Sequence, residues 1–344
     1  MSTGTAAARL GLTRAVVGQL AASVGGLGLV LVLAAILTPS FYSGANLTLI
    51  LSQVGFIGVT AIGQTFVLLV GGIDLSVGAV IGLTMVTVAV VSGGHSAHLA
   101  PAIILAFVLG LAVGAANAFL TVVRRVPPFI ATFASFTLTE GAVLAWTKGA
   151  PSGQIPASLD PLGAGSVGPI PVPALIFVGL LAVSAVALAR GTYGRRIYAT
   201  GYNPVAARMA GVPAKLVVAS TYLVCAGCAV LGGLMLSGYT GYVDNQLIGS
   251  LNLTSIAAAV VGGTSLAGGR GGVLRSTVGV VLIAVLNSFM VLVNAGNAGQ
   301  LIIEGLVILV AVWLQARPRG AGLPAAQRGA PRESALASST NQQP

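Results

Sequence analysis

Charged side chains are the scarcest class in this sequence. Only 6% of the 344 residues are Asp, Glu, Lys or Arg, and 56% are hydrophobic, whereas soluble domains typically carry roughly 25% charged residues. A soluble globule could not cover its surface with so few charges, so that class of protein is excluded. Between Arg14 and Arg124 the one charged residue is Asp74. Most of the chain must therefore face lipid.

Residues that build metal, redox or nucleotide sites are also few. The only cysteines, Cys225 and Cys228, share one apolar stretch, so apolar packing explains them better than a disulfide framework or a redox motif. His95 and His98 share a loop, but two ligands are too few for a zinc site. Residues 163–168 match Gly-x-Gly-x-x-Gly without a preceding strand, and no Gly-x-x-x-x-Gly-Lys-Ser/Thr loop occurs. We therefore expect neither a metal nor a cofactor.

Long apolar segments are what the sequence has in abundance. A membrane-spanning helix needs about 20 apolar residues, and the 48 glycines would allow such helices to pack closely. The apolar segments lie at about 15–38, 47–70, 76–92, 99–123, 128–147, 171–189, 216–237, 252–268, 273–293 and 301–316. This pattern predicts an all-α, polytopic membrane protein with about ten transmembrane helices, forming one domain over 15–316.

The basic residues predict the orientation of these helices, because Lys and Arg accumulate on the cytoplasmic side. With the N-terminus inside, Lys148 is the only one of the 16 that lies outside. The others, on the cytoplasmic side, are Arg9, Arg14, Arg124, Arg125, Arg190, Arg195, Arg196, Arg208, Lys215, Arg270, Arg275, Arg317, Arg319, Arg328 and Arg332. Both termini are thus expected in the cytoplasm, with polar, disordered tails at 1–14 and 317–344. The net charge of +10 forms no basic face interleaved with aromatics, so no nucleic-acid partner is expected.

The lone acid Asp74 stands in a glycine-bounded octet, Gly-Gly-Ile-Asp-Leu-Ser-Val-Gly at 71–78. A carboxylate in an apolar stretch needs a partner, a water-filled cavity or an interfacial position. We favour a cap of the following helix, bonding the amides near Ser76 and Val77, over a contact with a solute. Segment 47–92 is compatible with two spans meeting at the octet or with one span and a broken helix. Residues 262–269 have the same spacing as the octet, Gly-Gly-x-x-Leu-x-x-Gly. This similarity comes either from a duplicated broken-helix element or from chance.

Segment 190–215 is the longest hydrophilic insertion between apolar segments. Asn203 and Pro204 can begin a helix over 205–210, and Gly211 followed by Pro213 would end it. A short helix presented to the cytoplasm fits a contact with a soluble motor protein. A basic loop that only sets the topology is the alternative.

Three motifs together resemble the ribose-type sugar permeases, the membrane subunits of ATP-binding-cassette (ABC) importers. They are GGIDLSVGAVIGL at 71–83, GYNPVAARMAGVP at 201–213 and VVGGTSLAGGRGGV at 260–273, in the family's order. The resemblance covers roughly residues 20–316. It implies a bacterial cytoplasmic-membrane protein that works with a cytoplasmic ABC ATPase, an extracytoplasmic solute-binding protein and a second permease subunit, as homodimer or heterodimer. The permease itself would have no catalytic residues.

The same resemblance implies roles for particular residues. Segment 201–213 would be the coupling helix that docks on the ATPase, through Gly201, Asn203, Pro204, Ala207, Arg208 and Gly211. The other two motifs would be structural, through Gly71, Gly72, Gly78, Gly262, Gly263 and Gly269.

The path of the solute must be sought among polar residues within the apolar segments. The candidates are Gln64, Asp74, Asn117, Glu140, Asn287 and Glu304, with Gln53 as a further amide. For the amides, a hydrogen bond between helices fits as well as a place in the path. The predicted function is import of a ribose- or xylose-like monosaccharide; an ABC permease for branched-chain amino acids or another non-sugar solute is the alternative. An ion-coupled transporter would use Asp74, Glu140 and Glu304 for protons, but the scarcity of acids and the coupling-loop match disfavour it.

Overall fold

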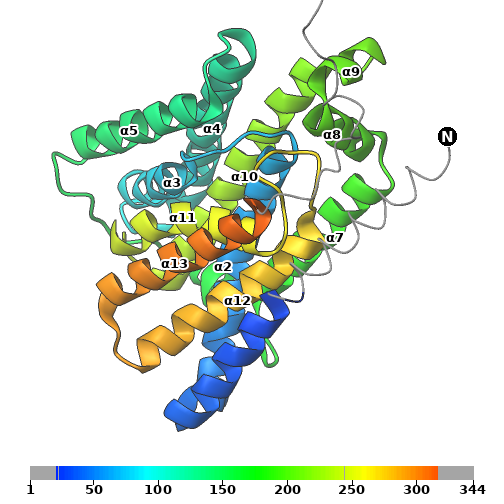
Figure 1. Cartoon of the computed structure of the whole chain (residues 1–344). Coiled ribbons are helices and arrows are strands. Elements are labelled where there is room, and N and C mark those ends of the chain that lie inside the picture. Colours follow the sequence, from blue (N-terminus) through cyan, green and yellow to red (C-terminus); the bar gives the residue numbers. More distant parts are fainter. Residues whose placement is uncertain (1–20, 22, 244, 317–344) are drawn as a thin grey trace, which may run out of the picture.

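The computed structural model describes residues 21, 23–243 and 245–316, so both predicted tails, 1–14 and 317–344, lie outside the described residues. The described chain is mostly helical (Figure 1). It begins with a helix at Ser23–Leu37. The longer elements that follow are α2 (Gly44–Leu69), α3 (Val77–Ser92), α4 (Leu99–Ala118), α5 (Pro128–Trp146), α7 (Val172–Ala189), α8 (Thr192–Tyr202), α10 (Ala214–Thr240), α11 (Asn245–Val261), α12 (Val273–Leu292) and α13 (Gly296–Ala316). The short elements are η1 (Pro39–Tyr42), η2 (Ser96–His98), η3 (Phe119–Val123), η4 (Ala157–Leu159), α6 (Asp160–Gly163), β1 (Ser166–Val167), β2 (Ile170–Pro171) and α9 (Pro204–Met209).

Each of the ten predicted apolar segments contains a helix, which confirms a polytopic helical membrane protein. Within the described part of the chain, six helices are long and apolar enough to cross a bilayer: Gly44–Leu69, Ser96–Val123, Pro128–Trp146, Val172–Ala189, Ala214–Thr240 and Val273–Leu292. The shorter apolar helices are Ser23–Leu37, Val77–Ser92, Leu251–Val261 and Ala298–Trp313. Ten spans with both termini in the cytoplasm stay a prediction.

A small antiparallel hairpin departs from the all-α expectation. Strands β1 and β2 pair Ser166 with Pro171 and Val167 with Ile170, in the loop between α6 and α7. Gly168, with a φ of +59°, allows the tight reversal between the strands, since glycine adopts positive φ at little cost.

The chain breaks at the glycine octet, between α2 and α3. Helix α2 ends at Leu69, and Gly71 takes a φ of +80°. The amides of Gly71 and Gly72 donate to the carbonyls of Leu68 and Val67 at 2.9 and 3.0 Å. After an irregular stretch, α3 begins at Val77 and is buried on all sides from there to Ala89. A helix that is apolar all round belongs in a core, and α3 accordingly packs against α4, α5, α10 and α11.

Helix α2 is the other central helix, and it packs against α7, α10, α11 and α12. Small residues make these contacts close, as expected between helices in a bilayer. A Cβ on Gly63 would lie 2.8 Å from Cβ of Cys228 and 2.9 Å from Cα of Cys225. Both cysteines are buried and carry no disulfide, which agrees with apolar packing.

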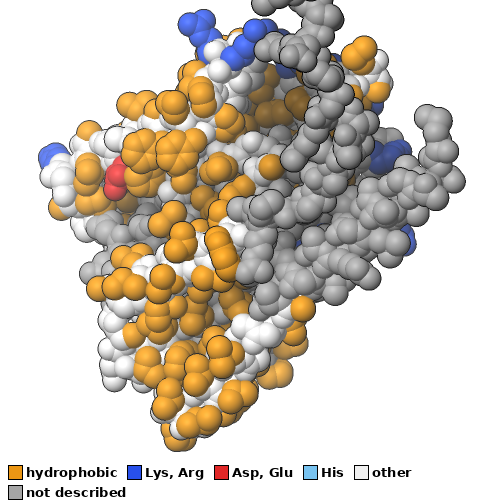
Figure 2. Space-filling model, in the orientation of Figure 1, with side chains coloured by type: hydrophobic (Ala, Val, Ile, Leu, Met, Phe, Trp, Pro, Cys, Tyr) orange, Lys and Arg blue, Asp and Glu red, His pale blue; other side chains and the backbone are white. Residues whose placement is uncertain are grey.

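The outer surface of the described chain is rich in apolar side chains (Figure 2). Ile104 on α4, Leu138 on α5 and Val183 on α7 are each about two-thirds or more exposed. Patches of this kind mark a membrane-facing surface. Most Lys and Arg side chains visible in Figure 2 lie toward the end of the molecule that carries α8 and α9.

We expect Gly63→Leu to destabilise the protein, because the side chain would collide with the backbone of α10. Overpacking of this kind typically costs about 1–3 kcal/mol. The apparent melting temperature in detergent, followed by size-exclusion chromatography, should fall. Gly227→Ala on α10 is the matched control, since nothing lies within 4 Å of its added Cβ; an equal loss in both variants would refute the packing explanation.

Candidate functional site

A short two-helix projection, α8 and α9, occupies the hydrophilic segment 190–215. Asn203 caps α9: its Oδ1 accepts from the amides of Val205 and Ala206, each at 3.0 Å. Pro204 fills the first position of α9, where its missing N–H costs nothing. Gly211, with a φ of +78°, turns the chain away after the helix. The helix predicted at 205–210 is therefore present, as Pro204–Met209.

The projection presents apolar side chains to its surroundings. Tyr202 is 75% exposed, Val205 55% and Met209 86%, whereas Ala207 is buried. Arg208 is exposed too, and its Nε donates to the carbonyl of Pro204 at 3.2 Å. Exposed apolar residues beside a basic side chain are typical of a surface that binds another protein.

The three glycine motifs, far apart in the sequence, meet where the projection joins the helices. The amide of Gly269 donates to the carbonyl of Leu69, the last residue of α2, at 2.9 Å. Gly201 packs so tightly that a Cβ would collide with that same carbonyl. A Cβ on Gly268 would lie 2.8 Å from the nitrogen of Gly71. We call Leu69, Gly71, Gly201, Gly268 and Gly269 the glycine junction.

The loop between α11 and α12 is tied to the projection and to the core. The hydroxyl of Tyr198, on α8, donates to the carbonyl of Gly271 at 3.1 Å. Burial raises the pKa of the Tyr198 phenol, and the positive charge of Arg275 partly opposes that rise. On the inner side, the Ser276 hydroxyl lies 2.8 Å from that of Thr65 on α2 and 3.1 Å from that of Thr264. The loop therefore bridges α8, α2 and α12.

The remaining predicted glycines lie close to these contacts. A Cβ on Gly262 would lie 2.5 Å from Cα of Ser276, and one on Gly72 would lie 2.9 Å from the hydroxyl oxygen of Tyr222. Gly263 has a φ of +98° where α11 ends. Gly78 is buried in the first turn of α3.

Three predicted path residues form one buried polar cluster at the octet. Asp74, 1% exposed, accepts at Oδ1 from the amide of Ser76 at 2.8 Å and its hydroxyl at 2.6 Å. Asn117 Nδ2 donates to Ser76 Oγ at 2.8 Å and lies 3.4 Å from Asp74 Oδ1. With its amide nitrogen toward the Asp74 carbonyl, Gln64 donates there at 3.1 Å and accepts from the Asp74 amide at 3.2 Å.

This cluster holds the irregular backbone between α2 and α3 inside the protein. Irregular backbone at membrane depth survives only where protein groups satisfy its polar atoms, and Gln64 does so for both backbone groups of Asp74. The carboxylate accepts from the amide of Ser76, one of the two expected. The N-cap residue of α3 is nevertheless Ser76, without a side-chain cap, so Asp74 holds the turn before the helix and does not cap it. Gln64, Asp74 and Asn117 thus have partners within the protein itself.

A separate polar cavity of about 170 Å³ lies among α2, α10, α11, α12 and α13. Two predicted path residues, Asn287 and Glu304, line it together with Gln53. The hydroxyl of Thr254 is 3.1 and 3.2 Å from the two oxygens of Glu304. Thr254, Phe56 and Tyr239 also line the cavity, and nothing in their local sequence distinguishes them from ordinary core residues. Glu140, in contrast, is exposed on α5 and belongs to neither group.

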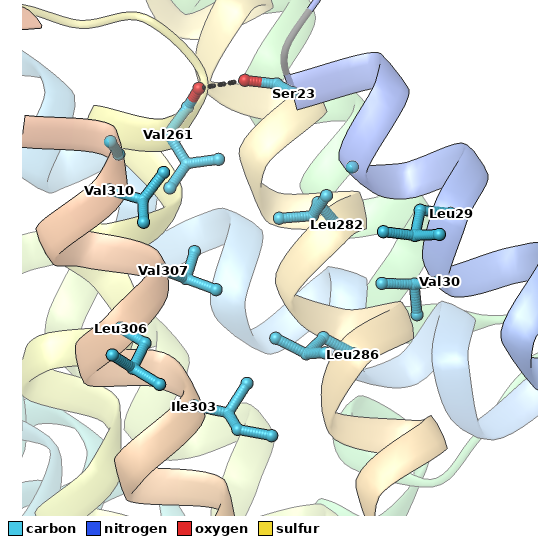
Figure 3. A pocket seen from close by; sticks show the side chains of 12 residues that line it. Ser23, Leu29, Val30, Val261, Leu282, Leu286, Ile303, Leu306, Val307 and Val310 are labelled. Carbon is cyan, nitrogen blue, oxygen red and sulfur yellow. Dashed lines mark hydrogen bonds between the residues drawn. The ribbon is translucent and has the colours of Figure 1, made fainter. Parts of the chain in front are cut away.

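A larger cavity of about 340 Å³ lies between the helix Ser23–Leu37, α12 and α13. The hydroxyl of Ser23 donates to the carbonyl of Val261 at 2.6 Å. Figure 3 shows that the other labelled lining side chains are aliphatic: Leu29, Val30, Val261, Leu282, Leu286, Ile303, Leu306, Val307 and Val310. Aliphatic side chains of this kind offer no hydrogen bonds to a polar solute. The polar cavity lined by Asn287 and Glu304 is therefore the better candidate for solute contact.

Comparison with known proteins places the chain among membrane permeases. Residues 46–312 match the family described as branched-chain amino acid transport system, permease component. The chain is 36% identical to the ribose import permease protein RbsC of Bacillus subtilis, over 84% of this chain and 90% of that protein. It is 33% identical to the Haemophilus influenzae RbsC, over 83% and 89%. The autoinducer 2 import system permease protein LsrC of Salmonella paratyphi B is 31% identical, over 82% of each chain. No solved structure matches the chain.

We expect Asp74→Leu to prevent stable folding and Asp74→Asn to be tolerated. The hydrogen bonds from Ser76 and Asn117 to the side chain of Asp74 end on Oδ1, and an asparagine keeps an acceptor oxygen there. Leucine would leave buried donors unpaired, at about 1–3 kcal/mol each. Yield and melting temperature of the purified protein measure the difference.

Equal destabilisation by Asp74→Asn and Asp74→Leu would contradict this account, because it would mean that the charge itself matters. A well-folded Asp74→Asn variant that lost transport would instead assign Asp74 to the solute path.

Proposed function

The chain belongs to the family of branched-chain amino acid transport system permease components, and on that premise we propose that it is the membrane subunit of an ABC importer for a small sugar. The single observation that carries the proposal is the projecting helix α9 seated on the glycine junction. A separate cytoplasmic ATPase would bind ATP and push on α9, and an extracytoplasmic binding protein would deliver the solute. The permease itself performs no chemistry.

The contacts at the junction supply a route for that push. Helix α8 meets the end of α2 through the backbone of Gly201 and meets the 262–272 loop through Tyr198. That loop leads directly into α12. Where backbones touch directly, one element cannot move without moving its neighbour. Packed interfaces shift between discrete arrangements and do not deform continuously. Movement of α9 would therefore tilt α2 and α12 together.

The basic residues of the projection indicate how the protein is oriented in the membrane. Arg195, Arg196 and Arg208 belong to α8 and α9, and basic residues favour the cytoplasm. The glycine junction then lies inside, with both termini, and the start of α2 at Gly44 lies toward the binding protein. The transmembrane domain would extend over 15–316 in a bacterial cytoplasmic membrane, paired with a second permease subunit.

The names of the relatives favour a sugar. The ribose and autoinducer 2 permeases are 31–36% identical over more than four-fifths of this chain. The family description instead mentions branched-chain amino acids, and that makes such a solute the second candidate. A ribose-like monosaccharide is the solute that we propose, because the polar cavity offers hydrogen-bonding groups.

The decisive experiment is reconstitution in liposomes with a candidate ABC ATPase and a candidate solute-binding protein. Ribose uptake that requires both ATP and the binding protein is the expected result. Leucine uptake under the same conditions would support the amino-acid alternative. Uptake by this chain alone, driven by a proton gradient, would overturn the importer.

We also expect Met209→Glu to abolish uptake and co-purification of the ATPase, since it places a carboxylate in the exposed apolar surface of α9. The folded permease should remain intact because Met209 is 86% exposed. Met209→Leu is the matched control and should keep at least half of the wild-type uptake. Normal ATPase binding by Met209→Glu would show that α9 is not the docking element.

A further inference from the structure

The polar cavity and the glycine junction lie at different heights on the same helix. Gln53, which lines the cavity, precedes Leu69 of the junction by 16 residues along α2, which corresponds to about 24 Å at 1.5 Å per residue. Tyr239 and Asn287 lie near the C-terminal ends of α10 and α12, away from the loop that forms the junction. The cavity therefore occupies the half of the protein opposite to the projection.

The cavity contains buried polar atoms that the described residues leave open to a ligand. Glu304 is 5% exposed. The hydroxyl of Thr254 contacts both of its oxygens, and the side chain of Asn287 also bonds to it. A carboxylate can accept about four hydrogen bonds, so part of the acceptor capacity of Glu304 remains. Oε1 of Gln53 is buried without a hydrogen-bond partner among the described residues. Leaving such groups unpaired is costly, so they commonly mark a binding site.

An aromatic wall stands beside these polar groups. The rings of Phe56 and Tyr239 meet edge to face, with centroids 5.1 Å apart and planes at 62°, and both line the cavity. A few polar groups set among apolar and aromatic walls is the usual composition of a small-molecule site. The volume of about 170 Å³ is below the 300–1,000 Å³ that is typical of drug-sized ligands, so the cavity suits one small solute.

The charges of the lining restrict that solute further. Among the described residues that line the cavity, Glu304 is the only charged one, and none is Lys or Arg. An anionic solute would face a carboxylate without a compensating cation. The carboxylate of a zwitterionic amino acid would likewise lack a cationic partner. Hydroxyl groups, in contrast, can donate to Glu304 and Gln53, while a C–H face packs on Phe56 and Tyr239.

We propose that this cavity is a transient binding site for a neutral polyhydroxylated solute on its way through the protein. Glu304 accepts hydrogen bonds from the solute hydroxyls, and Gln53 and Asn287 complete the polar side. Thr254 is a positioning residue that holds the Glu304 carboxylate toward the cavity. This assignment rests on the proposed importer function and deepens it, because it locates the solute contact and favours a sugar over an amino acid.

The first test compares Glu304→Gln with Glu140→Gln in the reconstituted importer, using ribose as the probe. Glu304→Gln keeps the size but removes the charge of the main acceptor, and we expect at least a tenfold loss of uptake with unchanged binding of the ATPase. Glu140→Gln is the matched control on exposed α5 and should keep wild-type uptake. Wild-type uptake by a folded Glu304→Gln variant would overturn the assignment.

The second test does not depend on uptake and decides the matter if Glu304→Gln fails to fold. Single cysteines at Gln53→Cys and Asn287→Cys are treated in membrane vesicles with a membrane-impermeant methanethiosulfonate. We expect both to react, and to react at least threefold more slowly with ribose-loaded binding protein and ATP present. Val183→Cys, exposed on the apolar face of α7, should react slowly and without any effect of ribose.

Different outcomes would refute the importer function and the assignment of the cavity as its solute site. Absence of ATP-dependent uptake by the wild-type importer, for ribose and leucine alike, would refute the importer function even with reactive thiols in the cavity. ATP-dependent uptake together with unreactive cysteines at 53 and 287 would keep the importer and refute the cavity as its solute site.

Discussion

One backbone contact organises the mechanical part of this protein: the carbonyl of Leu69, at the end of α2, receives the amide of Gly269 and lies directly against Gly201. Three chain segments, each more than 60 residues from the next, can approach so closely only because two of them present glycine. A side chain at either position would separate α8 from α2, and the projecting helix α9 would lose its rigid support.

Helix α2 connects the glycine junction to the polar cavity. Its last residue belongs to the glycine junction, and Gln53, about 24 Å away, lines the polar cavity. Small residues such as Gly63 keep it pressed against α10. A helix fixed at one end and packed tightly along its length moves as a unit, so an event at α9 and a change at the cavity can share one moving part. In this way, movement of α2 would couple the ATPase to the solute site.

The polar residues of the interior divide into two groups with different uses. Around Asp74, hydrogen bonds with Ser76, Asn117 and Gln64 stabilise the break between α2 and α3. Around Glu304, acceptor capacity remains open toward a cavity. Both acids are equally conspicuous in the sequence as charges in apolar segments. Their surroundings, and not their chemical type, separate a structural role from a ligand-binding one.

Local patterns in the sequence determined the membrane class, the ten apolar helices and the start and end of α9, because hydropathy, capping and proline act over a few residues. The glycine motifs and the polar candidates were also recognisable one by one. Their grouping was decided only by the tertiary structure: the meeting of Gly71, Gly201 and Gly269, the pairing of Asp74 with Asn117, and the cavity shared by Gln53 and Glu304. Contacts across tens to hundreds of residues depend on how helices pack, and packing depends on shapes that no single segment encodes.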